Sequence, residues 1–489
     1  MNKDFNIRLI MRIFGMLLLV ETMALLTAVL VGIYYRETDV KYFLIVTGIT
    51  LFTGISCILI GKNAKPTIGR REGSFIVTFI WIVFTIFGLL PFWISGSIPS
   101  FTDAFFETIS GFTTTGASIL NNIEELSHAM LYWRSLTHWI GGLGIIVISL
   151  ALLPVFGIAG SQLFINETPG PTKDKIHPKL NETAKRLFLI YFILTAAETI
   201  LLWFGGMGWF DALNHSFATI ATGGFSTKQA SVGYWSSPYI QYVIGIFMVL
   251  AGVNFSLYYF GFKNKLSKIR ENEELRYYLI TLFVFCIMVA ISLIDFSKEV
   301  TFTSVEKAWR DAFFNVTSCM TTTGFATQDY MYWDTFTWII LLIVMLTGAS
   351  AGSTSGAIKM VRIVLVVKYM YYELKRIVHP NAVMPVKYNG LNVKEMVISK
   401  VLAFVIMYLF TVAIGILILA ISGMGFLESI GGLITCLGGV GPGLGLVGPA
   451  GNFADVPEFS KWFLSFIMLL GRLELFTVLV LLIPAFWKK

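Results

Sequence analysis

The sequence is poor in charge and in cysteine. Only 13% of its 489 residues are Asp, Glu, Lys or Arg, against roughly 25% in soluble domains, and 56% are hydrophobic. This composition excludes an intrinsically disordered chain and a set of soluble domains. The four cysteines are too few for a disulfide scaffold, and each falls within an apolar segment. We therefore predict free, buried thiols at Cys57, Cys286, Cys319 and Cys436.

Motifs of enzymes and of nucleotide-binding domains are also missing. The five histidines show no HExxH or other metal-ligand spacing, and no Walker A or Gly-x-Gly-x-x-Gly segment stands between a strand and a helix. The Gly-rich run at 441–448 follows an expected pore helix, so we reject it as a phosphate site. The sequence predicts neither an enzyme nor a cofactor in this chain. Its net charge of +7 does not indicate a nucleic-acid partner, because the basic residues lie between long apolar runs.

Long apolar runs occur along nearly the whole chain. A transmembrane helix needs about 20 apolar residues, and runs of this kind occur about ten times. They predict an all-α polytopic membrane protein with about ten transmembrane helices. The first run is too long for a cleavable signal peptide, and no small-residue cleavage site follows it. The predicted spans are 10–34, 42–60, 74–95, 129–156, 186–206, 238–261, 277–295, 335–377, 395–422 and 462–486.

Lys and Arg concentrate in alternate loops. An even number of spans places both termini on one side, and the basic loops at 62–71, 173–186, 263–276 and 359–394 fall on that same side. By the positive-inside rule this side is the cytoplasm. The opposite loops are rich in Asp and Glu, so a negative outer vestibule could concentrate cations. Ordinary solvated loop charge is the alternative.

Four of the outer loops contain a repeat. Each holds a segment too short to span a membrane, which starts with an acidic residue and has Gly thirteen positions later. Thr stands two positions before that Gly in three segments, and Gly in the fourth. The acidic residues are Asp103, Asp211, Asp311 and Glu428, and the glycines, which we call the filter glycines, are Gly116, Gly224, Gly324 and Gly441. The repeat divides the chain into a helix pair at 1–70 and four pore units at 71–160, 161–265, 266–380 and 381–489.

The composition of these segments suits a cation pore. About ten residues of helical character precede each Thr/Gly run, and the acidic residue is expected to cap that helix. Four helix C-termini at one axis favour a cation there, and non-helical backbone at this depth lines water or is buried in protein. Gly adopts the positive φ that aligns successive carbonyls, so we predict a carbonyl-ring selectivity filter. Its residues are Thr114, Thr115, Gly116, Thr222, Gly223, Gly224, Thr322, Thr323, Gly324, Gly439, Val440 and Gly441.

With these loops the chain resembles the superfamily of K⁺ transporters, which includes the bacterial Trk and Ktr translocation subunits and the plant and yeast Trk and HKT proteins. The resemblance covers about residues 70–489, and the extra N-terminal helix pair makes the chain more similar to the TrkH type than to the shorter KtrB type. It implies four units folded like one K⁺ channel, with K⁺ bound at the filter residues. Ser at the first filter glycine is associated with Na⁺ transport in related proteins, so Gly116 implies a preference for K⁺. Gly439 and Val440 offer no hydroxyl, so the filter should lack four-fold symmetry and be less selective than a K⁺ channel.

The resemblance also implies partners. Bacterial relatives work as homodimers in the inner membrane and bind a cytosolic TrkA-like ring of regulatory subunits. ATP, ADP or NAD is therefore expected on that partner. The basic loops at 173–186, 263–276 and 359–394 are candidate docking surfaces, and the positive-inside rule alone is the alternative explanation of their charge.

The run from Thr347 to Lys359 interrupts the second helix of the third unit. It is poor in helix formers, so it should unwind and border water or polar protein. It resembles the intramembrane loop that blocks the pore beneath the filter in this superfamily. A kinked helix packed through small residues is the alternative. The expected gate residues in this run are Gly348, Ala349, Ser350, Gly352, Ser353 and Gly356.

Arg472 lies inside the last predicted span, where an unpaired charge costs about 2.5–3.5 kcal/mol. We expect it to face the protein, and the resemblance places it beside the pore near that loop. There we expect its guanidinium to bond loop carbonyls and to add an electrostatic barrier as part of the gate. An ion pair with Glu474 or Glu198 is the alternative. For Glu21, Glu198 and Glu474, structural hydrogen bonding and a proton relay are both open.

Together these features predict K⁺ uptake across a bacterial inner membrane, through a pore that an intramembrane loop gates and the membrane potential drives. The alternative is a K⁺ symporter coupled to Na⁺ or H⁺. Such carriers typically show paired inverted repeats, whereas the four units here run in one orientation.

Overall fold

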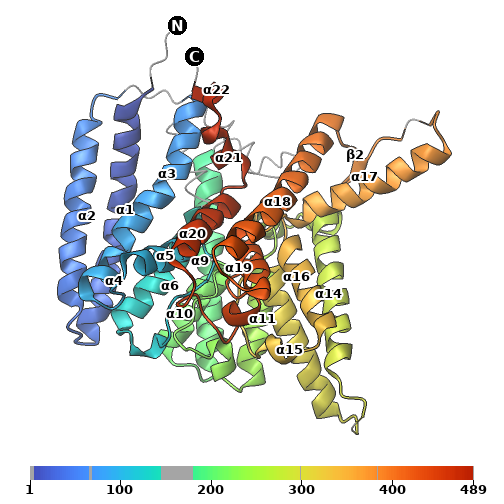
Figure 1. Ribbon diagram of the computed structural model, residues 1–489, viewed down its shortest axis with the longest axis horizontal. Helices are drawn as coiled ribbons and strands as arrows, with labels where there is room; N and C mark the ends of the chain where they lie inside the picture. Colours follow the sequence, from blue (N-terminus) through green and yellow to red (C-terminus); the bar gives the residue numbers. More distant parts are fainter. Residues whose placement is uncertain (1–4, 65–68, 145–179, 298, 383, 488–489) are drawn as a thin grey trace.

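The computed structural model describes residues 5–64, 69–144, 180–297, 299–382 and 384–487 (Figure 1). These residues form helices and loops apart from one hairpin, in which β1 (Lys387–Tyr388) pairs antiparallel with β2 (Leu391–Asn392). The predicted all-α fold class is confirmed. The end of the predicted span 129–156 and the predicted unit boundary at 160–161 lie outside the described residues.

Four units follow one plan, with a first helix, a short pore helix and a second helix. The first unit consists of α3 (Arg70–Gly88) with α4 (Leu90–Ser95), pore helix α5 (Phe101–Phe112) and α6 (His128–Leu143). The second consists of α9 (Leu180–Phe204), pore helix α10 (Trp209–Ile220), and α11 (Pro238–Ala251) with α12 (Phe255–Phe262). The third consists of α14 (Glu273–Leu293), pore helix α15 (Phe302–Met320), and α16 (Thr335–Thr347) with α17 (Met360–Val378). The fourth consists of α18 (Glu395–Ile421), pore helix α19 (Phe426–Gly438), and α20 (Glu458–Arg472) with α21 (Phe476–Leu479). The short helices are α13 (Leu266–Arg270), α22 (Pro484–Trp487) and 3₁₀ turns at 123–125, 231–234, 330–332, 445–447 and 480–482.

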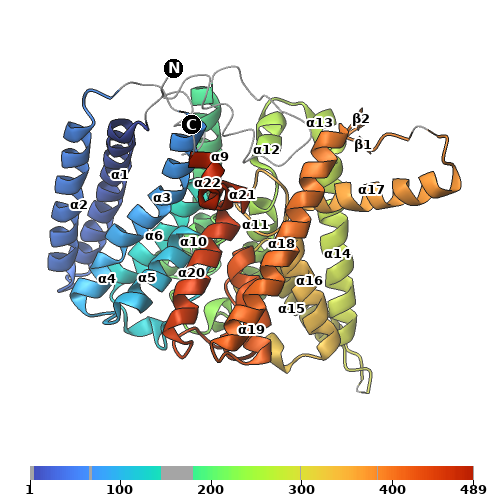
Figure 2. The same cartoon turned by 45° about the horizontal axis from the view of Figure 1, so that its top comes forward.

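Two long helices precede these units. α1 (Ile7–Tyr34) and α2 (Val40–Ile60) lie side by side at one edge of the molecule, and α1 packs on α3 and α6 (Figures 1 and 2). A Cβ on Gly15 would lie 2.5 Å from the carbonyl oxygen of Gly54, so the two backbones touch through small residues. The beginning of α1 and the last helix, α22, lie at the same end of the molecule.

Within the residues that the structure describes, the second helix is broken in the second, third and fourth units. α11 and α12 meet at 92°, α20 and α21 meet at 110°, and the loop 348–359 separates α16 from α17. The spans predicted over 238–261 and 462–486 each contain one of these bends, which the sequence analysis did not predict. Asn254 begins α12 as an N-cap, and Glu474 and Leu475 both adopt positive φ, a conformation that an α-helix of L-residues avoids.

Several helices are long and apolar enough to cross a membrane. Among the described residues these are α1, α2, α3 with α4, α9, α14 and α18, and the bent pairs α11–α12 and α20–α21 pass the same test as pairs. Apolar side chains such as Leu409, Phe410 and Leu417 remain exposed on α18, as expected for a face in contact with lipid. All four cysteines are buried and free, as predicted.

The pore helices lie at the centre of the units. Residues 104–112 of α5 are all buried, and α10, α15 and α19 bury their C-terminal halves. Glycines of two second helices lie in close contact with the C-terminal ends of pore helices. A Cβ on Gly141 would lie 1.9 Å from the Phe112 carbonyl oxygen, and one on Gly471 would lie 2.0 Å from that of Leu437. The ends of the pore helices are thus fixed deep in the protein.

Candidate functional site

The four predicted filter loops meet in a closed ring. A Cβ placed on the filter glycine of one loop would lie 1.9–2.8 Å from the carbonyl oxygen of the residue that precedes the glycine of the next loop. The contacts run from the first loop to the second, third and fourth and back to the first, so the loops surround one axis. The contacting pairs are Gly116 with Gly223, Gly224 with Thr323, Gly324 with Val440, and Gly441 with Thr115. These carbonyls leave no room for a side chain at the filter glycines.

All four loops share one backbone conformation. The filter glycine and the residue two positions before it have φ between 53° and 103° in every loop. This conformation costs an L-residue about 1–2 kcal/mol, yet Thr114, Thr222 and Thr322 adopt it. Gly439 adopts it in the fourth loop, which therefore differs from the others in its side chains and not in its backbone path.

A cavity lies outside the ring and touches all four filter glycines. Its charged lining residues are Arg134 and Lys228, and no acidic residue of the described chain lines it. Carboxylates of the outer loops have local partners instead. Asp103 pairs with the ammonium of Lys461 at 2.6 Å, and Asp211 accepts a hydrogen bond from a threonine hydroxyl at 2.7 Å.

The acidic residues do not cap the pore helices as predicted. Ser100 caps α5 and accepts a hydrogen bond from the backbone N–H of Asp103, which therefore lies in the first turn. Asp211 and Glu428 also lie in first turns, where a negative charge still favours the helix, and Asp311 lies in the middle of the longer α15.

In three units, the residue four positions after the acidic residue bonds its pore helix to the chain beyond the filter. His215 Nε2 lies 2.9 Å from Ser226 Oγ, and the side-chain amide of Asn315 donates to Thr327 Oγ1 at 3.1 Å. Gly432 occupies this place in the fourth unit. The sequence analysis missed these residues, although their constant offset from the acidic residues was available.

Glu107 occupies this place in the first unit. Its carboxylate accepts hydrogen bonds from the backbone N–H of Ile119 (2.9 Å), from Ser118 Oγ (3.1 Å) and from Arg134 Nε (2.6 Å). Arg134 also donates to Ser118 Oγ at 3.1 Å and to the carbonyl of Ser226, beyond the second filter loop, at 2.9 Å. The two charged side chains are 0% and 2% exposed, so the ion pair is shielded from solvent.

The loop 348–359 lies at the opposite end of the ring. The cavity touches the last residues of the filter loops, whereas the loop 348–359 contacts the residues at which the pore helices end. The loop is unwound between α16 and α17, so the alternative of a kinked helix is wrong. The contacts are Thr354 Oγ1 to the Ile220 carbonyl (3.0 Å), Ala357 N–H to the Gly438 carbonyl (3.0 Å) and Gly356 N–H to Thr322 Oγ1 (2.7 Å).

The second helix of the second unit also bonds to the loop. The backbone N–H of Ser350 donates to the carbonyl of Gly252 at 3.0 Å, and the carbonyl of Gly352 accepts from the N–H of Phe255 at 3.1 Å. Both contacts are to the break between α11 and α12. All the residues predicted for the gate within this run lie in the loop, namely Gly348, Ala349, Ser350, Gly352, Ser353 and Gly356.

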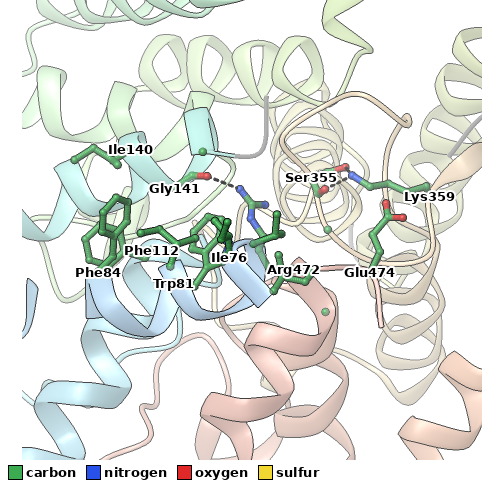
Figure 3. A pocket seen from close by; sticks show the side chains of 17 residues that line it. Ile76, Trp81, Phe84, Phe112, Ile140, Gly141, Ser355, Lys359, Arg472 and Glu474 are labelled. Atoms are coloured by element: carbon green, nitrogen blue, oxygen red, sulfur yellow. Dashed lines mark hydrogen bonds between the residues drawn. The ribbon is translucent and has the colours of Figure 1, made fainter. Parts of the chain in front are cut away.

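Arg472 bonds to backbone carbonyls at the end of α20. Its Nη1 donates to the carbonyl of Thr354 in the loop at 2.8 Å. Its Nη2 donates to the carbonyl of Gly141 at 3.0 Å (Figure 3). Glu474 does not pair with it, because its carboxylate binds Arg362 at 2.6 Å. The hydrogen bonds of Arg472 therefore join the loop to the second helix of the first unit.

A second cavity lies beside this contact. Its apolar lining includes Ile76, Trp81 and Phe84 of α3, and its charged lining residues are Lys359, Arg472 and Glu474 (Figure 3). Lys359 Nζ bonds to the carbonyl of Ser355 within its own loop. We call the cavity that touches the filter glycines the mouth of the ring. The mouth and this inner cavity thus lie on opposite sides of the filter loops.

Known proteins match the chain over almost its whole length. The TrkH family, described as cation transport protein, matches residues 48–489. The Trk system potassium uptake protein TrkH of Escherichia coli (strain K12) is 39% identical over 490 residues, covering 99% of this chain and 100% of that protein. TrkH of Halomonas elongata is 36% identical with the same coverage. The crystal structure of the potassium transporter TrkH from Vibrio parahaemolyticus matches with a TM-score of 0.89 at 36% identity, covering 99% of this chain and 100% of that one.

Alanine substitutions at two glycines distinguish whether the ring requires glycine because of steric crowding or because of positive φ. At Gly324 an added Cβ lies 1.9 Å from the Val440 carbonyl oxygen, whereas at Gly439 nothing lies within 4 Å, and both glycines have positive φ. Overpacking costs about 1–3 kcal/mol, so Gly324→Ala should lower cation flux into liposomes by about tenfold or more. Gly439→Ala should retain most of the flux. Equal losses in the two variants would show that close approach is not what requires glycine in the ring.

Proposed function

This chain belongs to the TrkH family of cation transport proteins, and we propose that it takes up K⁺ through the ring of filter loops. It is a membrane transport protein and not an enzyme, in agreement with the sequence prediction. The observation that carries the proposal is the closed set of contacts between filter glycines and carbonyls of the next loop. These contacts bring main-chain oxygens from four directions to one axis, which is the arrangement that replaces the water around a K⁺ ion.

The surroundings of the ring favour a monovalent cation. The C-termini of α5, α10, α15 and α19 end at the filter loops, so their partial negative charges face the ion path. The described lining of the mouth carries no carboxylate, and backbone oxygens bind a cation without adding fixed charge. A membrane potential that is negative inside drives each ion inward with about 2.3 kcal/mol per 100 mV.

In this proposal the loop 348–359 and Arg472 form the gate. The loop contacts the ends of α10 and α19 and the third filter loop, so it stands in the path of an ion that leaves the ring. Arg472 adds a positive charge there, and its two bonds to carbonyls leave that charge without a carboxylate partner. Opening requires the loop to move away from Arg472 and from the pore helices.

The proposed setting is a bacterial inner membrane with both chain ends in the cytoplasm. α1 begins at the same end of the molecule as α22, and the basic residues around α12 and α13 lie at that end too (Figure 2). A cytosolic TrkA-like ring that binds ATP, ADP or NAD would control the gate from this side.

A second copy of the chain is the proposed partner of α17. This helix projects from the body of the molecule (Figures 1 and 2). Val367, Tyr371, Leu374 and Val378 are all more than half exposed and recur at the spacing of one helix face. An apolar stripe of this kind is typical of a covered surface.

Flux of ⁸⁶Rb⁺ into liposomes tests the function. The purified chain should admit Rb⁺ under a potential that is negative inside, K⁺ should compete strongly, and Na⁺ should compete weakly. A pore needs no second ion, whereas a K⁺ symporter would stop when Na⁺ and the proton gradient are removed. Flux that persists without both gradients supports the pore, and flux that requires one of them supports the symporter.

Gly116→Ser should weaken the preference for K⁺. The added Cβ would lie 2.1 Å from the Gly223 carbonyl oxygen at a residue with φ +82°, so the first two loops must move apart. The competition assay should then show Na⁺ inhibiting Rb⁺ uptake several-fold more strongly. An unchanged K⁺ preference would count against Gly116 as a filter residue.

Arg472→Ala should raise Rb⁺ flux several-fold in liposomes that contain this chain alone. The variant loses both hydrogen bonds that fix the loop and removes the positive charge below the ring. Arg376→Ala on α17 is the matched control, because Arg376 pairs with Glu373 on its own helix. A flux equal to wild type in Arg472→Ala would refute the gating role.

A further inference from the structure

A charged side chain connects the first and second filter loops just beyond their filter glycines. We call the place where two neighbouring loops are connected in this way a junction. Arg134 donates to Ser118 Oγ, two residues after Gly116, and to the carbonyl of Ser226, two residues after Gly224. It therefore bonds to the continuation of both loops. Its guanidinium also stacks on the Phe225 ring at 3.7 Å, which fixes its plane.

Neutral groups join the other three junctions. They are Gly233 N–H with the Ala326 carbonyl (3.0 Å), the Tyr330 hydroxyl with the Gly443 carbonyl (2.8 Å) and Phe453 N–H with the Ser118 carbonyl (2.8 Å). None of these bonds places a charge beside the ion path. The first junction differs because a guanidinium has a planar fork of donors that can bond two loops at once.

A charge at this place affects every ion that enters. Arg134 lines the outer cavity together with the filter glycines, and its side chain is 2% exposed, so salt in solution screens it poorly. A cation at the mouth would meet this charge. Glu107, at 2.6 Å, cancels it, and the same carboxylate also holds the N–H of Ile119 beyond the first loop.

We propose that Glu107 and Arg134 are a positioning pair that sets both the cation preference and the entry rate of the pore. Arg134 fixes the distance between the first two filter loops, and Glu107 neutralises Arg134 at the mouth. A buried ion pair adds little net stability compared with apolar packing, so specificity is the property that it supplies here. This inference rests on the proposed conduction of K⁺ through the ring.

The two members of the pair have separable effects. Arg134→Gln removes the fork between the loops and the positive charge that lines the mouth, so the preference falls while the rate is kept. Glu107→Gln leaves an uncompensated guanidinium that repels K⁺ and Na⁺ alike, so the rate falls. The double variant removes both charges, so it recovers the rate without the preference. Damage to the fold alone would not give this recovery.

The test is ⁸⁶Rb⁺ uptake by the full chain in liposomes at a fixed negative-inside potential, with K⁺ or Na⁺ as competitor. Arg134→Gln should lower the preference for K⁺ over Na⁺ by about fivefold or more at an undiminished rate. Glu107→Gln should lower the initial rate by about tenfold, and the double variant should return to within about twofold of Arg134→Gln. Glu306→Gln, which removes a carboxylate paired with Arg310 on pore helix α15, is the matched control and should match wild type.

Two outcomes overturn the proposal: a wild-type preference in Arg134→Gln, or a double variant no faster than Glu107→Gln. If Glu107→Gln does not elute from size-exclusion chromatography as a single folded species, the Arg134→Lys variant tests the proposal instead. This variant keeps the positive charge and loses the planar fork of donors. It should lower the preference at near wild-type rate, and an unchanged preference overturns the proposal. A wild-type protein that admits Na⁺ and K⁺ equally would refute the proposed function instead.

Discussion

The structure depends on one contact repeated four times, in which a main-chain carbonyl of one filter loop fills the space that a side chain would need in the next. Because the contacts close on themselves, no loop can shift without its neighbours. The pore helices and second helices hold the filter loops in this ring. The pore helices bury polar and apolar residues alike in order to reach it, and second helices press on their ends through Gly141 and Gly471.

Two arginines lie on opposite sides of the ring, and their surroundings differ. Arg134, at the mouth, has a carboxylate partner and adds almost no net charge to the entrance. Arg472, on the inner side, bonds to two neutral carbonyls and keeps its full charge. An ion in the proposed pathway therefore passes Arg134, whose charge is compensated, and then the uncompensated charge of Arg472. Such a gradient suits a pore that is filled from outside and closed from inside.

The parts that could be predicted from the sequence are those that depend on local chemistry. The fixed distance between acid and glycine identified the four segments, and the alignment of successive carbonyls required positive φ, which all four filter glycines adopt. The predicted helix capping by Asp103 was wrong, because Ser100 is the N-cap of α5 and Asp103 lies in its first turn. The breaks in α11–α12 and α20–α21 were missed because an apolar run predicts a membrane span but does not show where its helix bends. The Glu107–Arg134 pair was missed because it joins elements that only folding brings together.

The most direct measurement is the anomalous scattering of crystals grown in Rb⁺. If the four loops hold a cation with main-chain oxygens, anomalous peaks should lie on the axis of the ring, within coordination distance of carbonyls from all four loops. Replacement of Rb⁺ by Na⁺ should remove these peaks. Rb⁺ sites elsewhere in the protein together with an empty ring would contradict the account.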